Sequence, residues 1–419
     1  MSHAPAPVVS RRAVLKGALG AAAMGVLGTD RAASRARDAR GALPEYVVVG
    51  GGIYGTGLAW ELGRRGARVL LVEADAVASG ASGGVGRRGV RSNGRDVRQL
   101  PLMPIAQERW RHWAARLGGR RIFDRVGHLH LVESEADLAK AEAQRRLQEE
   151  HGVRTQLVER EQLRRLEPDL SERVIAALYS PDDGSSDHSA TTHALARAAR
   201  LEGARLRRGV KVVGIELAAG RATAVVTSQG ERIGVGRELV LVANAGSAEL
   251  LGAALGLHLP LFNVLPQVLV TAPFRRVRVR HVIGHFSRRL ALKELPGRHL
   301  MITGGWLGRV NPETGRGETI DAQVAGNLAE AVAVYPRLAG VRLAHAVADR
   351  FESLTPDFLP IVDRPPGTSN VLVAAGPSGQ GWAPAPAYVE LIADWLVAGE
   401  RPALLAPFNF ARFAPASGG

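Results

Sequence analysis

Val47-Val48-Val49-Gly50-Gly51-Gly52-Ile53-Tyr54-Gly55 is the stretch that decides the fold. A short apolar strand runs into a Gly-x-Gly-x-x-Gly motif, and a helix-like segment over residues 58–62 follows it. A second apolar strand, residues 69–72, then ends at Glu73. This order predicts the βαβ unit that binds dinucleotides. A glycine-rich turn in an ordinary α/β protein is the alternative.

Each glycine of the motif has a predicted task. Gly50 permits the tight turn, Gly52 lets the backbone approach a pyrophosphate, and Gly55 lets helix and strand pack closely. The N-terminus of the following helix, at Ile53 and Tyr54, presents free N–H groups to the phosphates. Glu73 lies roughly 20 residues after the first glycine, where a carboxylate can bind the ribose hydroxyls.

Composition limits the remaining possibilities. The 419 residues favour two domains. Cysteine is absent, which excludes disulfides, thiolate metal sites and a cysteine-linked flavin. The net charge of +14 comes almost wholly from scattered arginines with no basic stripe among aromatic residues, so we expect no nucleic-acid binding. The histidines show no convincing metal spacing, and we expect no metal site.

The N-terminal residues have the pattern of a targeting signal. Residues 10–16, Ser-Arg-Arg-Ala-Val-Leu-Lys, resemble a twin-arginine export motif, and a weakly apolar stretch over residues 17–27 follows. That stretch is too short to span a bilayer, which needs about 20 residues. We therefore expect residues 1–40 to be a twin-arginine signal and spacer. The protein would be exported to the periplasm or cell envelope by the twin-arginine machinery, with peripheral membrane contact possible. A disordered basic tail is the alternative.

Periodicity along the chain predicts alternating helices and strands. Helices are expected over residues 101–117, 135–150, 190–202 and 386–396; strands over 126–132, 210–217, 222–227, 238–243, 264–271, 299–305 and 371–375. The βα unit at the start lies far from the last strand and its glycine loop. A cofactor domain built from separated segments, with a second sheet domain inserted, explains that order.

Six segments in this order resemble the FAD-dependent oxidoreductases of the D-amino-acid oxidase, glycine oxidase and sarcosine oxidase superfamily. They are the Gly50–Gly55 unit with Glu73, residues 80–82 with the arginines after them, 177–184 (ALYSPDDG), 243–247 (ANAGS), 352–361 (ESLTPDFLPI) and 376–382 (GPSGQGW). Residues 352–357 are also similar to the "ES.TPD" segment of dimethylglycine and sarcosine dehydrogenases.

The resemblance implies an α/β fold, with a Rossmann-like FAD-binding domain of the glutathione-reductase type and an interleaved antiparallel-sheet substrate domain above the flavin. We expect the FAD domain over residues 43–117, 186–260 and 346–413, and the substrate domain over 118–185 and 261–345. The flavin-linking histidine of the dehydrogenases is missing from residues 79–91, so FAD is expected to bind non-covalently.

Two sets of site residues follow from the resemblance. Cofactor contacts are expected from Gly50, Gly52, Ile53, Tyr54, Gly55, Glu73, Ala74, Ser82, Val212, Ala245, Gly246, Gly379, Gln380, Gly381 and Trp382, with the backbone of Val212 at the adenine. Candidate catalytic residues are Arg88 and Arg91, either of which could bind a substrate carboxylate, and Glu352. Glu352 stands where D-amino-acid oxidases place a carboxylate-binding arginine, and it either accepts a substrate ammonium or forms a structural ion pair. Gln380 and Asp363 also depart from the family pattern, and both are expected near the flavin ring.

The implied reaction is flavin-dependent oxidation of a C–N bond in an amino acid or N-methyl amino acid, with oxygen or a quinone as electron acceptor. Oxidation of a hydroxy acid or polyol on the same scaffold is one alternative. A weakly catalytic flavin-binding electron-transfer subunit is another.

Overall fold

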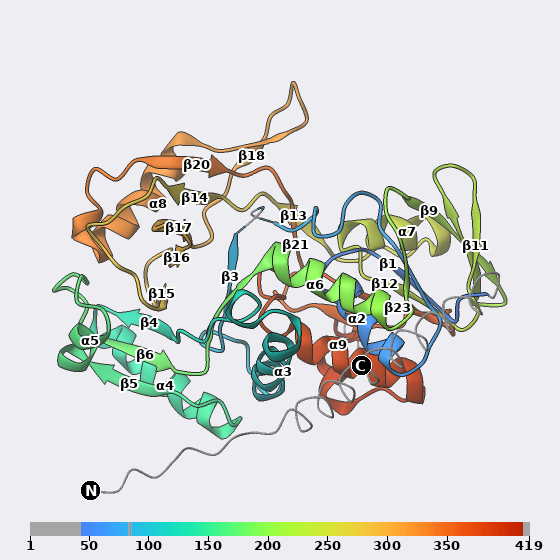
Figure 1. The fold of residues 1–419 in the computed structure, drawn as a ribbon, viewed down its shortest axis with the longest axis horizontal. Helices are drawn as coiled ribbons and strands as arrows, with labels where there is room; N and C mark the ends of the chain where they lie inside the picture. The colour runs from blue at the N-terminus through green and yellow to red at the C-terminus, as the bar shows by residue number, and fades with distance from the viewer. Residues whose placement is uncertain (1–42, 83, 85, 414–419) are drawn as a thin grey trace, which may run out of the picture.

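The structure is a computed structural model that describes residues 43–82, 84 and 86–413. Two sheets dominate it (Figure 1). The six-stranded sheet and its helices lie on the right of the view, and the eight-stranded sheet lies on the left. No helix among these residues is long and apolar enough to cross a membrane.

The six-stranded sheet is parallel except at one edge. Its order is β22-β23-β12-β1-β2-β8, and only β22 runs antiparallel to its neighbour. Its strands are β1 (Tyr46–Val49), β2 (Val69–Val72), β8 (Arg205–Arg207), β12 (Glu238–Leu241), β22 (Ile361–Asp363) and β23 (Val371–Ala375). The strands β1, β2 and β12 are buried along their whole length, as apolar runs covered on both faces should be.

Alternate residues of these strands enter two different cores. On one face, Val48 and Leu71 pack under a helical layer made of α2 (Ile53–Arg64), α3 (Leu102–Leu117), α6 (His188–Leu201) and α9 (Ala385–Ala398). On the other face, Val47 and Leu70 meet α7 (Ala245–Leu255) and a small sheet of β9 (Val212–Ala218), β10 (Arg221–Thr227) and β11 (Arg232–Gly234).

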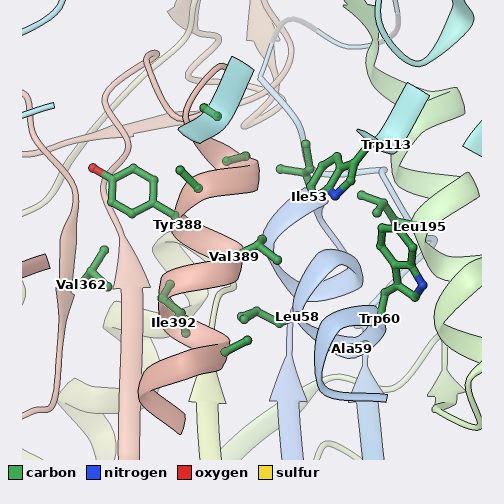
Figure 2. Packing of buried hydrophobic residues seen from close by; sticks show 14 of the residues in the cluster. Ile53, Leu58, Ala59, Trp60, Trp113, Leu195, Val362, Tyr388, Val389 and Ile392 are labelled. Carbon is green, nitrogen blue, oxygen red and sulfur yellow. The ribbon is translucent and has the colours of Figure 1, made fainter. Parts of the chain in front are cut away.

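Helix α2, the helix of the glycine motif, lies between α9 and α6 (Figure 2). Leu58 faces Val389 and Ile392 of α9, while Trp60 lies on the side of Leu195. A Cβ at Gly57 would stand 2.9 Å from Val389, so glycine at this position permits the close approach of α2 and α9. The N-terminal motif and the C-terminal helix are therefore fixed to each other.

The eight-stranded sheet has the order β20-β14-β17-β16-β15-β4-β6-β5 and is antiparallel except for the pair β15 and β4. Its strands are β4 (His128–Val132), β5 (Gln156–Glu159), β6 (Ala176–Ser180), β14 (Val268–Thr271), β15 (Val282–His285), β16 (Ala291–Leu295), β17 (His299–Thr303) and β20 (Leu343–Val347). One face packs against α8 (Asp321–Val334) and α5 (Arg160–Leu166), while α4 (Glu135–Glu150) covers part of the other.

Short elements connect the two halves. The strands β3 (Arg87–Val90) and β7 (Gly184–Asp187) form an antiparallel pair, as do β13 (Phe262–Val264) and β21 (Glu352–Leu354), and β18 (Arg309–Val310) and β19 (Gly317–Glu318). Short 3₁₀ helices cover Gly119–Arg121, Pro336–Leu338, Ala403–Phe408 and Phe410–Phe413.

The predicted fold class is confirmed, and most elements lie within a few residues of their predicted bounds. The prediction of one strand over residues 264–271 is wrong. That segment contributes to two strands of different sheets, β13 and β14, separated at Pro266, which lacks the N–H that a strand needs. The domain boundaries stay a prediction. All strands of the six-stranded sheet come from the segments assigned to the FAD domain, while β20 of the other sheet extends two residues past the predicted boundary at residue 345.

Candidate active site

A cavity of about 600 Å³ lies at the carboxyl ends of the parallel strands. Ligands bind at this edge in open α/β sheets. The lining residues come from all three segments of the predicted FAD domain: residues 49–54, 72–74, 78–82, 88, 188, 210–213, 242–244, 246, 249, 250, 253, 351, 352, 360, 362, 374, 375, 377, 379, 381 and 382. The wall therefore combines the backbone of the glycine turn with charged side chains, namely Glu73, Arg88, Lys211, Glu249 and Glu352.

The glycine turn has the geometry that the motif predicts. Gly50 has a φ of +119°, and a Cβ there would lie 2.6 Å from the carbonyl oxygen of Val242 on the neighbouring connection. Gly52 has no atom within 4 Å of such a Cβ, so its backbone is open to the cavity. Gly55 lies against the carbonyl of Gly50 and does not line the cavity, which fits a packing role.

Glu73 lines the cavity at the end of β2, as expected, and it also holds the turn together. Its Oε2 accepts a hydrogen bond from the backbone N–H of Gly51 at 2.5 Å, and its Oε1 accepts one from Asp75 N at 2.8 Å. Ala74 and Val212 lie at the same end, where Val212 begins β9. This end could hold a ribose and a base.

Glu352 lies at the opposite end of the cavity. It accepts hydrogen bonds from the hydroxyl of Ser82 and, at 2.8 Å, from the backbone N–H of Gly379. Burial raises the pKa of this carboxyl, and the hydrogen bonds from Ser82 and Gly379 together with nearby Arg88 oppose that shift. Glu352 thus connects the segment after β2 to the last glycine loop.

Arg88, on β3, carries a buried guanidinium in the same end of the cavity. Its Nη2 donates to the carbonyl oxygens of Ser82 and Gly84. Its Nη1 has no acceptor among the described residues. Burial lowers the pKa of Arg88 to about 10, which leaves it charged at neutral pH. A buried donor of this kind is costly unless a ligand supplies the acceptor.

His188 is a cavity residue that the sequence did not single out. Its Nδ1 and the Nε1 of Trp382 are buried without hydrogen-bond partners in the described part of the chain, and the two rings lie 5.2 Å apart. Burial, aided by Arg88, lowers the pKa of His188 to about 4, so it is neutral. The only sequence signal is its place directly after Asp187, which caps α6.

Some predicted site residues do not line the cavity. The Nη1 of Arg91 donates to the carbonyl of Asn93 at 2.6 Å, and the carbonyl of Gln380 accepts from Arg95 at 2.6 Å. Ala245 also lies outside the lining, while Gly246, Ile53, Tyr54 and Gly381 are part of it. These roles stay predictions. Asp363 does not line the cavity either, since its carboxylate accepts a hydrogen bond from Phe410 N at 2.8 Å, and its expected place near the flavin ring stays a prediction.

The residues present fit FAD. The open backbone at Gly52 and Gly379 suits a diphosphate and a ring edge, and the unpartnered polar atoms of Arg88, His188 and Trp382 lie where polar ligand atoms would satisfy them. Among residues 43–413 with their two gaps, no cluster of three potential metal ligands occurs.

Comparison with known proteins agrees with this geometry. A family model described as "FAD dependent oxidoreductase" matches residues 45–395. The chain belongs to this family. It is 25% identical over 379 residues to mitochondrial dimethylglycine dehydrogenase of Mus musculus, which covers 85% of the chain. It is 27% identical over 372 residues to 4-methylaminobutanoate oxidase (formaldehyde-forming) of Paenarthrobacter nicotinovorans, which covers 84%.

The chain spans 43% of the length of these two relatives. Among solved structures, L-proline dehydrogenase from P. horikoshii superposes with a TM-score of 0.81 and 25% identity, over 88% of this chain and 98% of that one. Glycine oxidase from Bacillus cereus superposes with a TM-score of 0.71 at 19% identity, over 89% and 100%, which shows a shared fold.

Proposed function

We propose that this FAD-dependent oxidoreductase oxidises the C–N bond of an amino acid or N-methyl amino acid. The observation that carries the proposal is the buried, unsatisfied Nη1 of Arg88 beside Glu352, at one end of a cavity whose other end suits a nucleotide. A guanidinium recognises a carboxylate by paired hydrogen bonds. The relatives named for dimethylglycine and 4-methylaminobutanoate support an amine that carries a carboxylate.

In this proposal the chain's own residues position the substrate. Arg88 pairs with the substrate carboxylate and fixes the carbon that bears nitrogen above the floor of the cavity. Bound FAD supplies the acceptor for the hydride that leaves this carbon. Glu352 carries a raised pKa and lies close to Arg88, so it can take a proton from an arriving ammonium or remain a structural link. The imine that results hydrolyses in water.

We further propose that FAD is held without a covalent bond. The chain has no cysteine, and residues 79–91 contain no histidine. Denaturation of the purified protein with trichloroacetic acid tests this: the yellow colour should stay in the supernatant. Colour in the precipitate would contradict it.

Anaerobic reduction of the purified holoprotein tests the reaction. Amino acids, N-methyl amino acids, hydroxy acids and polyols are added in turn, and loss of the flavin absorbance near its visible maximum is followed. We expect bleaching by an amine only. Bleaching by a hydroxy acid would favour the alcohol-oxidising alternative, and no bleaching by any compound would favour the electron-transfer subunit. Reoxidation by oxygen or by a quinone analogue then identifies the acceptor.

Export by the twin-arginine route also remains a proposal, because residues 1–42 lie outside the described part of the chain. Twin-arginine export carries folded proteins, which suits a protein that must acquire its cofactor before transport.

A further inference from the structure

The loop of residues 376–382, which joins β23 to α9, has one side on the cavity and another side turned to the interior. Ser378 and Gly379 both have positive φ angles, +55° and +71°, so the chain makes a tight turn here. Gly379 and Gly381 line the cavity, whereas Gln380 between them does not. What holds Gln380 from behind therefore fixes how its two neighbours face a ligand.

Arg95 holds Gln380 from behind. It lies in the segment between β3 and α3, and it is buried. Its Nη1 donates to the carbonyl of Gln380 at 2.6 Å, and its Nε donates to the carbonyl of Arg91 at 3.0 Å. The acceptors that the described part of the chain gives to Arg95 are neutral oxygens, including the side-chain Oε1 of Gln380. Its charge is therefore spread to its surroundings rather than neutralised by a bonded carboxylate, and the interior screens it little.

The neighbouring charges leave an excess of positive charge behind the loop. Arg91 is a second buried cation beside Arg95, and Asp183 is a carboxylate that acts on both. Asp183 accepts its hydrogen bonds from Ser92 and Gln107 and not from either guanidinium. Burial, aided by Arg91, lowers the pKa of Arg95 to about 9, so Arg95 keeps its proton at neutral pH.

The hydrogen bond from Arg95 also sets the direction of the peptide between Gln380 and Gly381. This peptide is trans, so its C=O and its N–H point to opposite sides. With the carbonyl held by Arg95, the N–H of Gly381 points away from the guanidinium, and it donates to no other backbone group of the described residues. Because Gly381 lines the cavity, this polarised N–H is available to a ligand there.

We propose that Arg95 is a positioning residue for the flavin: it presents the N–H of Gly381 to the isoalloxazine ring, and its buried charge raises the reduction potential of bound FAD. Reduction by two electrons and one proton leaves a negative charge on the ring system, and a fixed cation behind one peptide favours that charged form. The proposal depends on FAD binding in this cavity and not on the substrate, so it goes beyond the proposed amine oxidation.

Potentiometric titration of the holoprotein tests the charge of Arg95. Arg95→Gln keeps an N–H donor for the carbonyl of Gln380 but removes the charge. We expect two-electron reduction of bound FAD to become about tenfold less favourable, which is a potential lower by about 30 mV. Sulfite gives a second readout, because it adds to flavin N5 through its electron pair and leaves a negative charge on the ring. The variant should bind sulfite about tenfold more weakly.

Tyr54→Phe is the matched comparison at the same loop. Tyr54 donates through its hydroxyl to the carbonyl of Gly381 at 2.9 Å, so phenylalanine removes a neutral tether and no charge. This variant should bind FAD more weakly and keep a potential close to that of the wild type. Arg98→Met removes a cation of the same segment that is partly exposed and paired with Asp96 and Asp357, and it should change neither quantity.

An unchanged potential in Arg95→Gln would overturn the proposal, whatever the affinity for sulfite. An equal fall in potential in Tyr54→Phe would also overturn it, because the position of the loop and not the charge would then set the potential. If Arg95→Gln cannot be purified with FAD, Arg95→Lys decides, measured at about pH 6 so that the buried amine stays protonated. It should keep the wild-type potential at that pH, and a shift of about tenfold against reduction would refute the role of the charge. None of these measurements uses the substrate, so the proposed amine oxidation stands or fails separately.

Discussion

The two ends of the cavity differ in the groups that determine what each can bind. At the nucleotide end the backbone sets the geometry: Gly50 and Gly52 shape the turn, and Glu73 holds it by accepting a hydrogen bond from the backbone N–H of Gly51. At the other end, the charged side chains of Arg88 and Glu352 lie in the wall. The geometry of the turn is encoded by a few adjacent residues. The environment of a buried charge instead depends on strands that only the complete fold brings together.

This difference implies opposite sensitivities. At the nucleotide end, any side chain added to an open glycine should exclude the ligand without harming the fold. At the charged end, removing a side chain should change substrate binding while the cofactor stays bound. Loss of FAD from a variant at the charged end, or altered substrate binding with FAD retained in a variant at the nucleotide end, would show that the two ends do not have these separate roles.

Gly52→Val should give the largest effect, a complete loss of bound FAD. The valine methyl groups would occupy the space in which the diphosphate lies, and no protein atom stands within 4 Å of the new Cβ, so the fold should survive. The flavin absorbance of the purified protein measures FAD binding, and its circular dichroism measures whether the fold is retained. Gly252→Val, at an equally open glycine on α7 outside the cavity, is the control and should remain yellow. Retention of FAD by Gly52→Val would refute the assignment of the turn.

Replacing Arg11 and Arg12 together by lysine should block export almost completely. The paired arginines are the predicted recognition element, and lysine keeps the charge but not the guanidinium geometry. Immunoblotting of cytoplasmic and exported fractions checks the outcome. Export of the double variant at the wild-type level would show that residues 1–40 are not a twin-arginine signal.

Arg88→Met should raise the substrate KM by about tenfold to hundredfold with FAD still bound, because a charge-assisted hydrogen-bonded pair is lost in a buried site. Steady-state kinetics and the flavin content measure this. Arg91→Met is the matched comparison. The Arg91 guanidinium donates to the carbonyl of Asn93 and does not line the cavity, so this variant should lower the Tm and leave the substrate KM nearly unchanged. A larger KM effect at Arg91 would reverse the two assignments.

Asp183 should give the smallest effect, a change in the pH dependence of stability. Burial raises the pKa of Asp183 to about 6, against the hydrogen bonds that it accepts from Ser92 and Gln107. The folded state therefore holds this proton more tightly than the unfolded chain, and the associated stability is lost as pH rises from about 4 through 6. Asp183→Asn should flatten the change in Tm over that window by a few degrees. Asp394→Asn, exposed on α9, should leave it unchanged.

The sequence predicts the nucleotide end in detail because its determinants are local. The order of strand, glycines, helix and acid specifies the unit, and the structure places Gly50, Gly52 and Glu73 together as that order requires. The charged end is predicted less well. His188 is missed because a single histidine after a capping aspartate has no distinctive pattern, and Arg91 cannot be told from Arg88 without knowing which of them faces the cavity. The division of residues 264–271 between two sheets depends on long-range pairing, which periodicity does not contain.

Strand β23 has a consequence for biosynthesis. It lies between β22 and β12 in the central sheet, and Tyr54 donates through its hydroxyl to the carbonyl of Gly381, across 327 positions of the chain. During translation the amino-terminal turn leaves the ribosome long before β23 and α9 exist. The growing polypeptide therefore cannot complete its flavin cleft until β23 and α9 have been synthesised, and nascent chains truncated before β23 should never become yellow.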